Sequence, residues 1–238
     1  MKVAVVTGSA KGLGRAIALF LATEGYTLAV HYRESKKEAG EVVNQIRKKA
    51  PQSITVQADV TSEDEVKRMF GEILKKFGRV DLLVNNVGNF IYKKFKDTTF
   101  AEFEDIVESN IYSTFLCSRS VLSVMRRQKS GHIINIGIVG VNTLTVREKL
   151  TPYFMAKNAL YFLTKAMAWE EAAGGVHVNM ISPASLATDI FKASVFPMGR
   201  SANYDDVVKV LKFLISADAY YINGANIEVA GAFIAGMR

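Results

Sequence analysis

The segment Val3-Ala4-Val5-Val6-Thr7, followed by the turn Gly8-Ser9-Ala10-Lys11-Gly12-Leu13-Gly14, decides how the rest of the chain can fold. The apolar run predicts a buried strand, and the apolar-faced residues 15–24 predict a helix directly after the turn. Glycines in such a turn allow positive φ angles and let a pyrophosphate approach the backbone at the positive end of the helix. The segment therefore predicts the first strand and helix of a dinucleotide-binding fold.

The same alternation of strand and helix continues along the chain. We expect strands at residues 27–32, 53–58, 80–85, 132–136, 176–182 and 226–229, and helices at 36–49, 62–77, 100–128, 153–173 and 205–216. Ser62 is expected to cap its helix, with Glu65 at capping-box spacing. Strands separated by helices of this length require a parallel sheet with helices on both faces. The sequence predicts one α/β domain over residues 1–238, a doubly wound Rossmann-type sheet of about seven strands.

Composition excludes several classes of protein. No run of eighteen apolar residues exists, so no membrane span is expected, and the short apolar start does not resemble a secretory signal. The single Cys117 fits a reducing compartment, so we expect a cytoplasmic protein. His31, His132 and His177 lack metal-ligand spacing, and no metal is expected. The net charge of +7 comes from scattered cations, which favours a phosphate-rich cofactor or an acidic partner over nucleic acid.

The end of the second predicted strand indicates which nucleotide is bound. An acidic residue there would accept hydrogen bonds from a ribose 2′-hydroxyl and repel a 2′-phosphate. This chain has Tyr32-Arg33, and Lys11 lies in the glycine turn. Two cations favour NADPH over NADH. Glu34 could instead bind the hydroxyl, and Arg33 could be a solvated loop residue.

Tyr153 and Lys157 are four residues apart on a predicted helix. This spacing puts both side chains on one helical face. An ammonium group there can lower the pKa of the phenol from its reference of about 10. The pair therefore predicts a group that gives a proton to a reacting oxygen, although Tyr153 could also be a core tyrosine with a satisfied hydroxyl.

With these features the chain resembles the short-chain dehydrogenase/reductase family over essentially its whole length. The similar motifs, in the family's order, are Thr7-Gly8-x-x-x-Gly12-x-Gly14, Asp59-Val60, Asn85-Asn86-Val87-Gly88, Asn110, Tyr153-x-x-x-Lys157, Ser182-Pro183 and Thr188-Asp189. Within these motifs, two positions depart from the family pattern: Val87 replaces an alanine and Ala184 replaces a glycine.

The resemblance implies a mechanism and a cofactor site. A nicotinamide would pass hydride to a carbonyl carbon while Tyr153 protonates the oxygen. Lys157 would lower the pKa of Tyr153 and hold the nicotinamide ribose, and Asn110 would link Lys157 to a water chain. The implied cofactor-binding residues are Gly8, Lys11, Gly12, Leu13, Gly14, Arg33, Asp59, Val60, Asn86, Gly88, Tyr153, Lys157, Pro183 and Thr188.

One family residue is missing, because Ile138 occupies the position where relatives usually carry a serine bound to the substrate oxygen. Loss of one such donor costs roughly 10²–10³ in kcat. Three interpretations are open. Asn142, Thr143 or Thr145 supplies the bond; or the substrate needs no donor; or the protein is a catalytically impaired NADP(H)-binding regulatory or scaffold protein. Intact Tyr153, Lys157 and Asn110 argue against the last.

The segment after Thr188-Asp189 is short compared with the helical lid of many relatives. A short lid predicts an open pocket with exposed Phe191 and Phe196 and weaker exclusion of water.

The resemblance is greatest to 3-oxoacyl carrier-protein reductases, which implies a small-molecule or carrier-linked carbonyl substrate and a homotetramer or homodimer. Arg126, Arg127 and Lys129 end the central helix and could attract an acidic carrier protein, or simply complement the helix dipole. Apolar residues on that helix, namely Phe103, Ile106, Val107, Ile111, Phe115 and Leu122, fit either an interface or a core face.

Overall fold

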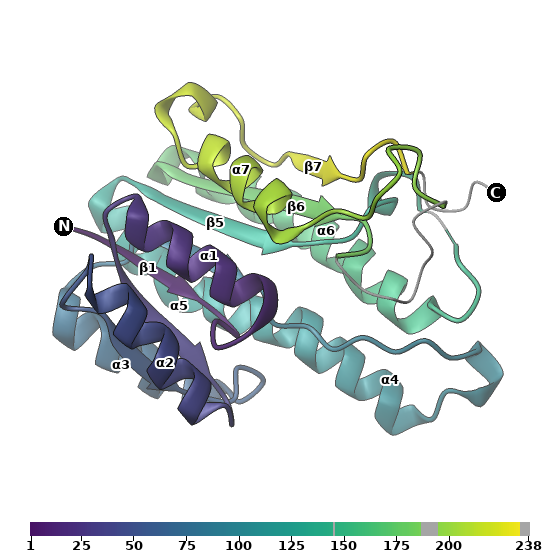
Figure 1. Ribbon diagram of the computed structural model, residues 1–238, viewed down its shortest axis with the longest axis horizontal. Helices are drawn as coiled ribbons and strands as arrows, with labels where there is room; N and C mark the ends of the chain where they lie inside the picture. Colours follow the sequence, from purple (N-terminus) through teal and green to yellow (C-terminus); the bar gives the residue numbers. More distant parts are fainter. Residues whose placement is uncertain (145, 187–194, 234–238) are drawn as a thin grey trace.

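The computed structural model describes residues 1–144, 146–186 and 195–233. Its strands form one parallel sheet of seven in the order β3-β2-β1-β4-β5-β6-β7 (Figure 1). The strands are β1 (Lys2–Val6), β2 (Tyr26–Tyr32), β3 (Ile54–Gln57), β4 (Leu82–Asn85), β5 (Gly131–Ile136), β6 (Val176–Pro183) and β7 (Asn226–Val229). The predicted α/β fold class is confirmed.

Helices cover both faces of the sheet. The α-helices are α1 (Gly12–Thr23), α2 (Lys36–Arg47), α3 (Glu63–Phe77), α4 (Phe100–Val107), α5 (Ser113–Gln128), α6 (Thr151–Glu171) and α7 (Tyr204–Leu214). One hydrophobic core joins α1, α2 and α7 to the sheet, and these helices lie in front of it in Figure 1. The second core joins α3, α5 and α6 to the opposite face.

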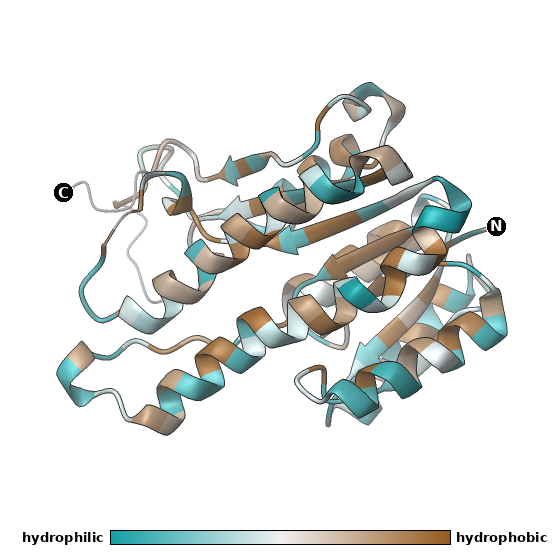
Figure 2. Cartoon of the chain, turned by 180° about the vertical axis from the view of Figure 1, so that it is seen from behind, coloured by the Kyte–Doolittle hydropathy of each residue, from teal (hydrophilic) through white to brown (hydrophobic). Residues whose placement is uncertain are grey.

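The alternation of side chains along each strand explains how one sheet contributes to two hydrophobic cores. Along β1, Ala4 and Val6 pack in the first core while Val5 packs in the second. Successive strand residues point to opposite faces, so a strand buried on both sides reads as a continuous apolar run. Figure 2 shows these strands in brown between helices whose outer faces are more polar.

The long helix expected at residues 100–128 is interrupted. A π-helical turn at Glu108–Tyr112 separates α4 from α5. Its cause is local, because Asn110 Nδ2 donates to the Ile106 carbonyl at 2.9 Å and Thr114 Oγ1 donates to the Asn110 carbonyl at 3.0 Å. Helix α4 extends beyond the edge of the sheet (Figure 1). Such π-turns often occur at functional sites.

Parallel order brings the carboxyl ends of the strands to one edge. The strand order reverses between β1 and β4, where the turn after β1 faces the loop after β4. In open α/β sheets, ligands bind at this switch point. Among the described residues, no helix has both the length and the hydrophobicity needed to cross a membrane.

Candidate functional site

The glycine turn is built for close backbone approach. Gly8 and Gly12 have φ angles of 64° and 54°, in the left-handed region that favours glycine. At Gly14, an added Cβ would overlap the Gly8 carbonyl oxygen and lie 2.7 Å from Asn86 Nδ2. The side chain of the N-cap residue Lys11 makes no capping hydrogen bond, and the first turn of α1 has no acidic residue. The first amides of α1 can therefore bind an anion.

Asn86 after β4 holds this turn in place. Its Nδ2 donates to the Thr7 carbonyl at 2.9 Å, and the backbone amides of Asn86 and Val87 donate to Thr7 Oγ1 at 2.9 and 3.1 Å. The predicted site residue Asn86 thus acts on the turn itself. Leu13 and Val60 have side chains buried in the two cores, so each can offer a cofactor only its backbone.

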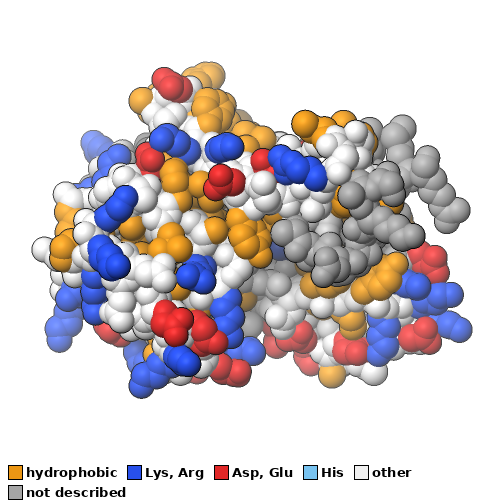
Figure 3. Space-filling model, viewed as in Figure 1, with side chains coloured by type: hydrophobic (Ala, Val, Ile, Leu, Met, Phe, Trp, Pro, Cys, Tyr) orange, Lys and Arg blue, Asp and Glu red, His pale blue; other side chains and the backbone are white. Residues whose placement is uncertain are grey.

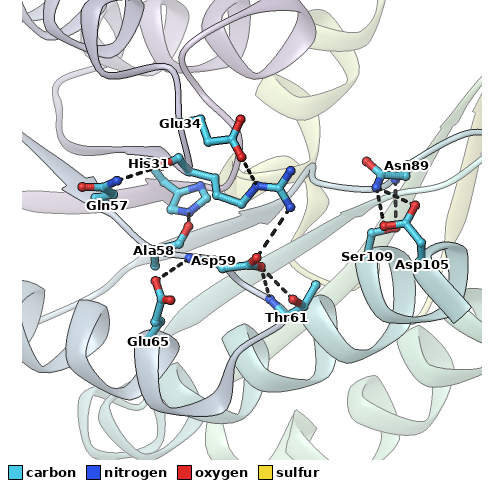
Figure 4. A network of polar contacts seen from close by, with 11 residues as sticks. His31, Glu34, Gln57, Ala58, Asp59, Thr61, Glu65, Asn89, Asp105 and Ser109 are labelled. Carbon is cyan, nitrogen blue, oxygen red and sulfur yellow. Dashed lines mark hydrogen bonds and ion pairs between the residues drawn. The ribbon is translucent and has the colours of Figure 1, made fainter. Parts of the chain in front are cut away.

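A carboxylate network forms the other end of the predicted cofactor site (Figure 4). Asp59 Oδ1 accepts from the Thr61 amide at 2.9 Å and from Thr61 Oγ1 at 2.7 Å. Burial raises the pKa of Asp59, but the bonds from Thr61 and the charge of Arg33 outweigh it and leave this pKa below its ordinary value. Asp59 therefore stays ionised at neutral pH.

The expected capping box at Ser62 is only half formed. Ser62 Oγ accepts from the Glu65 amide at 3.4 Å, as predicted. The Glu65 carboxylate, however, accepts from the Asp59 amide at 2.8 Å and so serves the Asp59 loop (Figure 4). The backbone of the loop turns this amide toward α3, which sequence spacing alone does not reveal.

Both cations expected to select the nucleotide lie beside the turn, and both are paired. Arg33 lies between Glu34 (Nε–Oε1, 3.6 Å) and Asp59 (Nη1–Oδ2, 3.5 Å), and Lys11 contacts Glu38 at 2.8 Å. The side chains of Lys11 and Arg33 are 62% and 57% exposed. Exposed pairs of this kind are worth about 0–1 kcal/mol, so an incoming anion can compete for these cations.

Tyr153 and Lys157 lie on α6, next to the carboxyl ends of β5 and β6. Lys157 is 4% exposed, and its Nζ donates to the Ile136 carbonyl at 2.8 Å. The same Nζ lies 5.5 Å from the centre of the Tyr153 ring. Phe90, from the loop after β4, packs edge-on against that ring with centroids 5.0 Å apart.

The expected lowering of the Tyr153 pKa is wrong for this structure. Burial raises the pKa of the Tyr153 hydroxyl to about 12 and lowers the pKa of the Lys157 ammonium to about 8. Desolvation disfavours the charged form of each group, and it is the cause of both shifts. Tyr153 is therefore protonated at neutral pH.

Asn110 and Lys157 approach each other at Gly88. A Cβ at Gly88 would overlap Asn110 Oδ1 and lie 3.4 Å from Lys157 Nζ. Asn110 Nδ2 donates to the Asn89 carbonyl at 3.1 Å, while its Oδ1 is buried and has no hydrogen-bond partner among the residues that the structure describes. A buried polar atom of this kind usually meets water or a ligand. This geometry fits a polar link between Asn110 and Lys157 at Gly88.

A cavity of about 260 Å³ lies beside Tyr153. The described residues that line it are mostly apolar: Phe90, Ile136, Gly137, Ile138, Val139, Arg147, Leu150, Tyr153, Pro183, Ala184, Ser185, Leu186, Phe196 and Phe233. Ile138 thus contributes a hydrocarbon surface next to the phenol. Arg147 and Ser185 bring polar groups that the sequence did not identify, because neither belongs to a recognised motif.

Two proposed substitutes for the serine point elsewhere. Asn142 Oδ1 accepts from Asn226 Nδ2 at 3.0 Å, and Thr143 Oγ1 donates to the Gly140 carbonyl at 3.2 Å. Neither residue lines the cavity. The third candidate, Thr145, lies outside the described residues.

The expectations for the segment after β6 are partly outside what the structure describes. Pro183 lines the cavity, whereas Thr188, Asp189 and Phe191 are not among the described residues. The expected exposure of Phe196 is wrong. This side chain is 4% exposed, because it packs against Phe233 at 5.4 Å between ring centroids.

Comparisons with known proteins show what this chain is similar to. The family model described as short chain dehydrogenase matches residues 2–196. A 3-oxoacyl-[acyl-carrier-protein] reductase FabG of Staphylococcus epidermidis is 37% identical, with 97% of this chain and 98% of that protein covered. A 3-oxoacyl-[acyl-carrier-protein] reductase of Synechocystis is 33% identical over 98% of this chain and 97% of its own. The crystal structure of acetoin dehydrogenase YohF from Salmonella typhimurium superposes with a TM-score of 0.89 at 30% identity, covering 98% of this chain and 95% of that one.

Proposed function

Because the chain belongs to the short-chain dehydrogenase/reductase family and is an NAD(P)H-dependent oxidoreductase, we propose that it reduces a ketone at the cavity beside Tyr153. The substrate proposed is a 3-oxoacyl thioester or a related ketone, as for the reductases that the chain resembles. The observation that carries this proposal is the Tyr153 side chain in an apolar cavity of about 260 Å³, with Lys157 buried behind it.

The proposed roles follow from the contacts of each residue. NADPH, when bound, supplies the hydride. Tyr153 keeps its proton, since its pKa is about 12, and gives that proton to the substrate oxygen as negative charge develops there. Lys157, held by the Ile136 carbonyl, keeps a positive charge close to the phenol and stabilises the phenolate that remains. Asn110 Oδ1, which accepts no bond from the described residues, would accept a hydrogen bond from a water molecule through which a proton returns toward Lys157 and Tyr153.

The same contacts favour a substrate that needs little polarisation. Ile138 offers no donor, and Asn142 and Thr143 are engaged outside the cavity. An absent donor costs about 3–4 kcal/mol of transition-state stabilisation. A ketone activated by a neighbouring carbonyl or thioester recovers part of this cost through its own electronic structure.

The proposed cofactor is NADPH in preference to NADH. Lys11 lies in the glycine turn and Arg33 follows β2, and both side chains are more than half exposed. A 2′-phosphate offers Arg33 two charge-assisted hydrogen bonds, which are stronger than its ion pairs at 3.5 and 3.6 Å. Glu34 is 83% exposed and can turn away into water.

Self-association is proposed through α6, as a homodimer or homotetramer. Met155, Phe162 and Trp169 follow at seven-residue intervals, so they share one face of the helix, and they are 51%, 75% and 87% exposed. Large exposed apolar side chains that gather on one face often mark an interface. On the preceding helical segment, Ile106 belongs to the core while Phe115 is 46% exposed.

An acyl carrier protein is the proposed macromolecular partner. Arg126 already forms an ion pair within the chain. Its Nε donates to Glu171 Oε2 at 2.6 Å, and Glu171 is buried. The proposed carrier contacts are therefore Arg127 and Lys129. In Figure 3 the Lys and Arg side chains are spread over the visible face, and no nucleic-acid site is proposed there.

The test is NADPH oxidation, followed by absorbance, with acetoacetyl thioesters, diketones, quinones and pterins. Tyr153→Phe is the matched control because it removes only the hydroxyl. We expect turnover of an activated ketone and its loss in the variant. Tight NADPH binding without turnover of any compound would instead favour the second candidate, a regulatory or scaffold protein that binds NADP(H), which the absence of a hydroxyl at Ile138 suggests.

A further inference from the structure

His31 connects two parts of the cofactor site that are far apart in sequence. It is the penultimate residue of β2 and only 2% exposed. The Gly8 amide donates to His31 Nδ1 at 2.8 Å, and His31 Nε2 lies 3.0 Å from the Ala58 carbonyl oxygen. One side of the ring therefore contacts the glycine turn. The other side contacts Ala58, the residue before Asp59 (Figure 4).

These two partners determine the protonation state of the ring. A backbone amide can only donate, so Nδ1 must accept and carries no proton. A carbonyl can only accept, so Nε2 carries the ring proton and donates it. His31 is thus a neutral imidazole with its proton on Nε2.

The backbone of His31 holds the next residue of the turn as well. The Ser9 amide donates to the His31 carbonyl at 3.0 Å, and the His31 amide donates to Ser9 Oγ at 2.9 Å. Gly8 and Ser9 are therefore both fixed to β2. Gly8 adopts its positive φ of 64° without strain, and the bond to His31 Nδ1 fixes the direction of its amide.

We propose that His31 is a positioning residue that joins the glycine turn to the Asp59 loop and makes cofactor affinity fall when its ring is protonated. This inference rests on the proposed function, since the glycine turn is taken to hold the dinucleotide. Protonation would place an N–H at Nδ1 facing the N–H of Gly8. The hydrogen bond would become a contact between two donors, and the turn would have to shift.

The surroundings of the ring set the direction of its titration. Burial lowers the pKa of His31 below its ordinary value of 6.5, while the bond to Ala58 and the charge of Asp59 act in the opposite direction. The other charged groups of this region are Arg33 and Glu34 after β2, Glu65 of α3, and the Lys11–Glu38 pair. The bond from Gly8 is thus complete above pH 6.5 and is lost as the pH falls toward the lowered pKa.

Three substitutions separate the two hydrogen bonds of the ring. In His31→Asn the side-chain oxygen can replace Nδ1 as the acceptor for Gly8 without titrating. In His31→Gln the side-chain amide can replace Nε2 as the donor to Ala58, and the acceptor near Gly8 is lost. His31→Phe keeps the ring volume and loses both bonds.

The experiment is a fluorescence titration of NADPH into each full-length variant, from about pH 5 to 8. We expect His31→Gln and His31→Phe to raise the Kd for NADPH roughly three- to tenfold at neutral pH. This increase corresponds to the loss of one hydrogen bond, the bond from the Gly8 amide. His31→Asn should bind nearly as well as the wild type at neutral pH. Below the pKa of His31 only the wild type should lose additional affinity, whereas His31→Asn should not.

The design separates this effect from other titrations. The 2′-phosphate and the surface carboxylates titrate in both the wild type and His31→Asn, so the difference between their curves belongs to His31. Thermal unfolding at each pH checks that every variant stays folded. The inference would be overturned if NADPH affinity fell equally at low pH in the wild type and in His31→Asn. It would also be overturned if all three variants bound NADPH with equal Kd values although their Tm was lowered. A wild type that binds no nicotinamide nucleotide at any pH would refute the proposed function instead.

Discussion

Replacing Ile138 with serine is the sharpest test of how this active site works. Ile138 lines the cavity beside Tyr153 and packs against two small hydrophobic clusters. Ile138→Ala is the matched control, because serine and alanine remove nearly the same apolar surface and differ by one hydroxyl. The ratio of their rates isolates the donor from the loss of packing.

The magnitudes follow from this position. Both variants should lose about 1–3 kcal/mol of unfolding free energy, since Ile138 is only partly buried and a truncated isoleucine leaves part of its volume empty. For a chain of this length, each kcal/mol lowers Tm by roughly 2–4 °C. The hydroxyl should raise kcat of Ile138→Ser over Ile138→Ala by up to roughly 10²–10³ for an unactivated ketone.

The assay compares kcat/KM for an unactivated ketone and for a diketone in both variants. A smaller gain is expected for the diketone, because its carbonyl is already polarised. Identical rates for serine and alanine, with both proteins folded and binding NADPH, would refute the reasoning. In that case the substrate oxygen does not lie next to position 138.

Four further predictions concern other parts of the site. Arg33→Ala should raise KM for NADPH about tenfold and leave NADH kinetics nearly unchanged, as steady-state assays with both cofactors would reveal; equal effects would exclude a 2′-phosphate contact. Gly14→Ala should abolish NADPH binding in a fluorescence titration, because its Cβ would overlap the Gly8 carbonyl and lie 2.7 Å from Asn86 Nδ2. The reduction rate should fall as the pH rises through about 8, where Lys157 loses its charge. In a pH–rate profile of Lys157→Arg, this fall should occur at a higher pH, because arginine keeps its charge. Arg147→Met should raise KM for acetoacetate more than for its neutral methyl ester, because Arg147 is the one charged side chain among the described residues of the cavity wall.

The sequence predicted the fold because its signals are local and repeated. Apolar runs bounded by glycine marked the strands, and the positions of the helices followed from their amphipathic periodicity. The observed ends of the helices and strands lie within two residues of the predicted ends at nearly every position. The interruption at Glu108–Tyr112 was missed, since the side chains of Asn110 and Thr114 bind backbone carbonyls there, which apolar periodicity does not reveal.

The sequence by itself determined the sheet, the glycine turn and the pairing of Tyr153 with Lys157 on one face of a helix, because each depends on residues within a few positions of one another. Only the tertiary structure decided the pKa of Tyr153 and which side chains line the cavity. Burial of the phenol by distant segments such as Phe90 raises its pKa to about 12, against the direction that spacing alone suggested. Arg147, Phe196 and Phe233 reach the cavity from separate loops, and His31 joins turns that follow different strands. Desolvation and long-range contacts depend on what surrounds a group in space, and a linear pattern of residues does not contain that information.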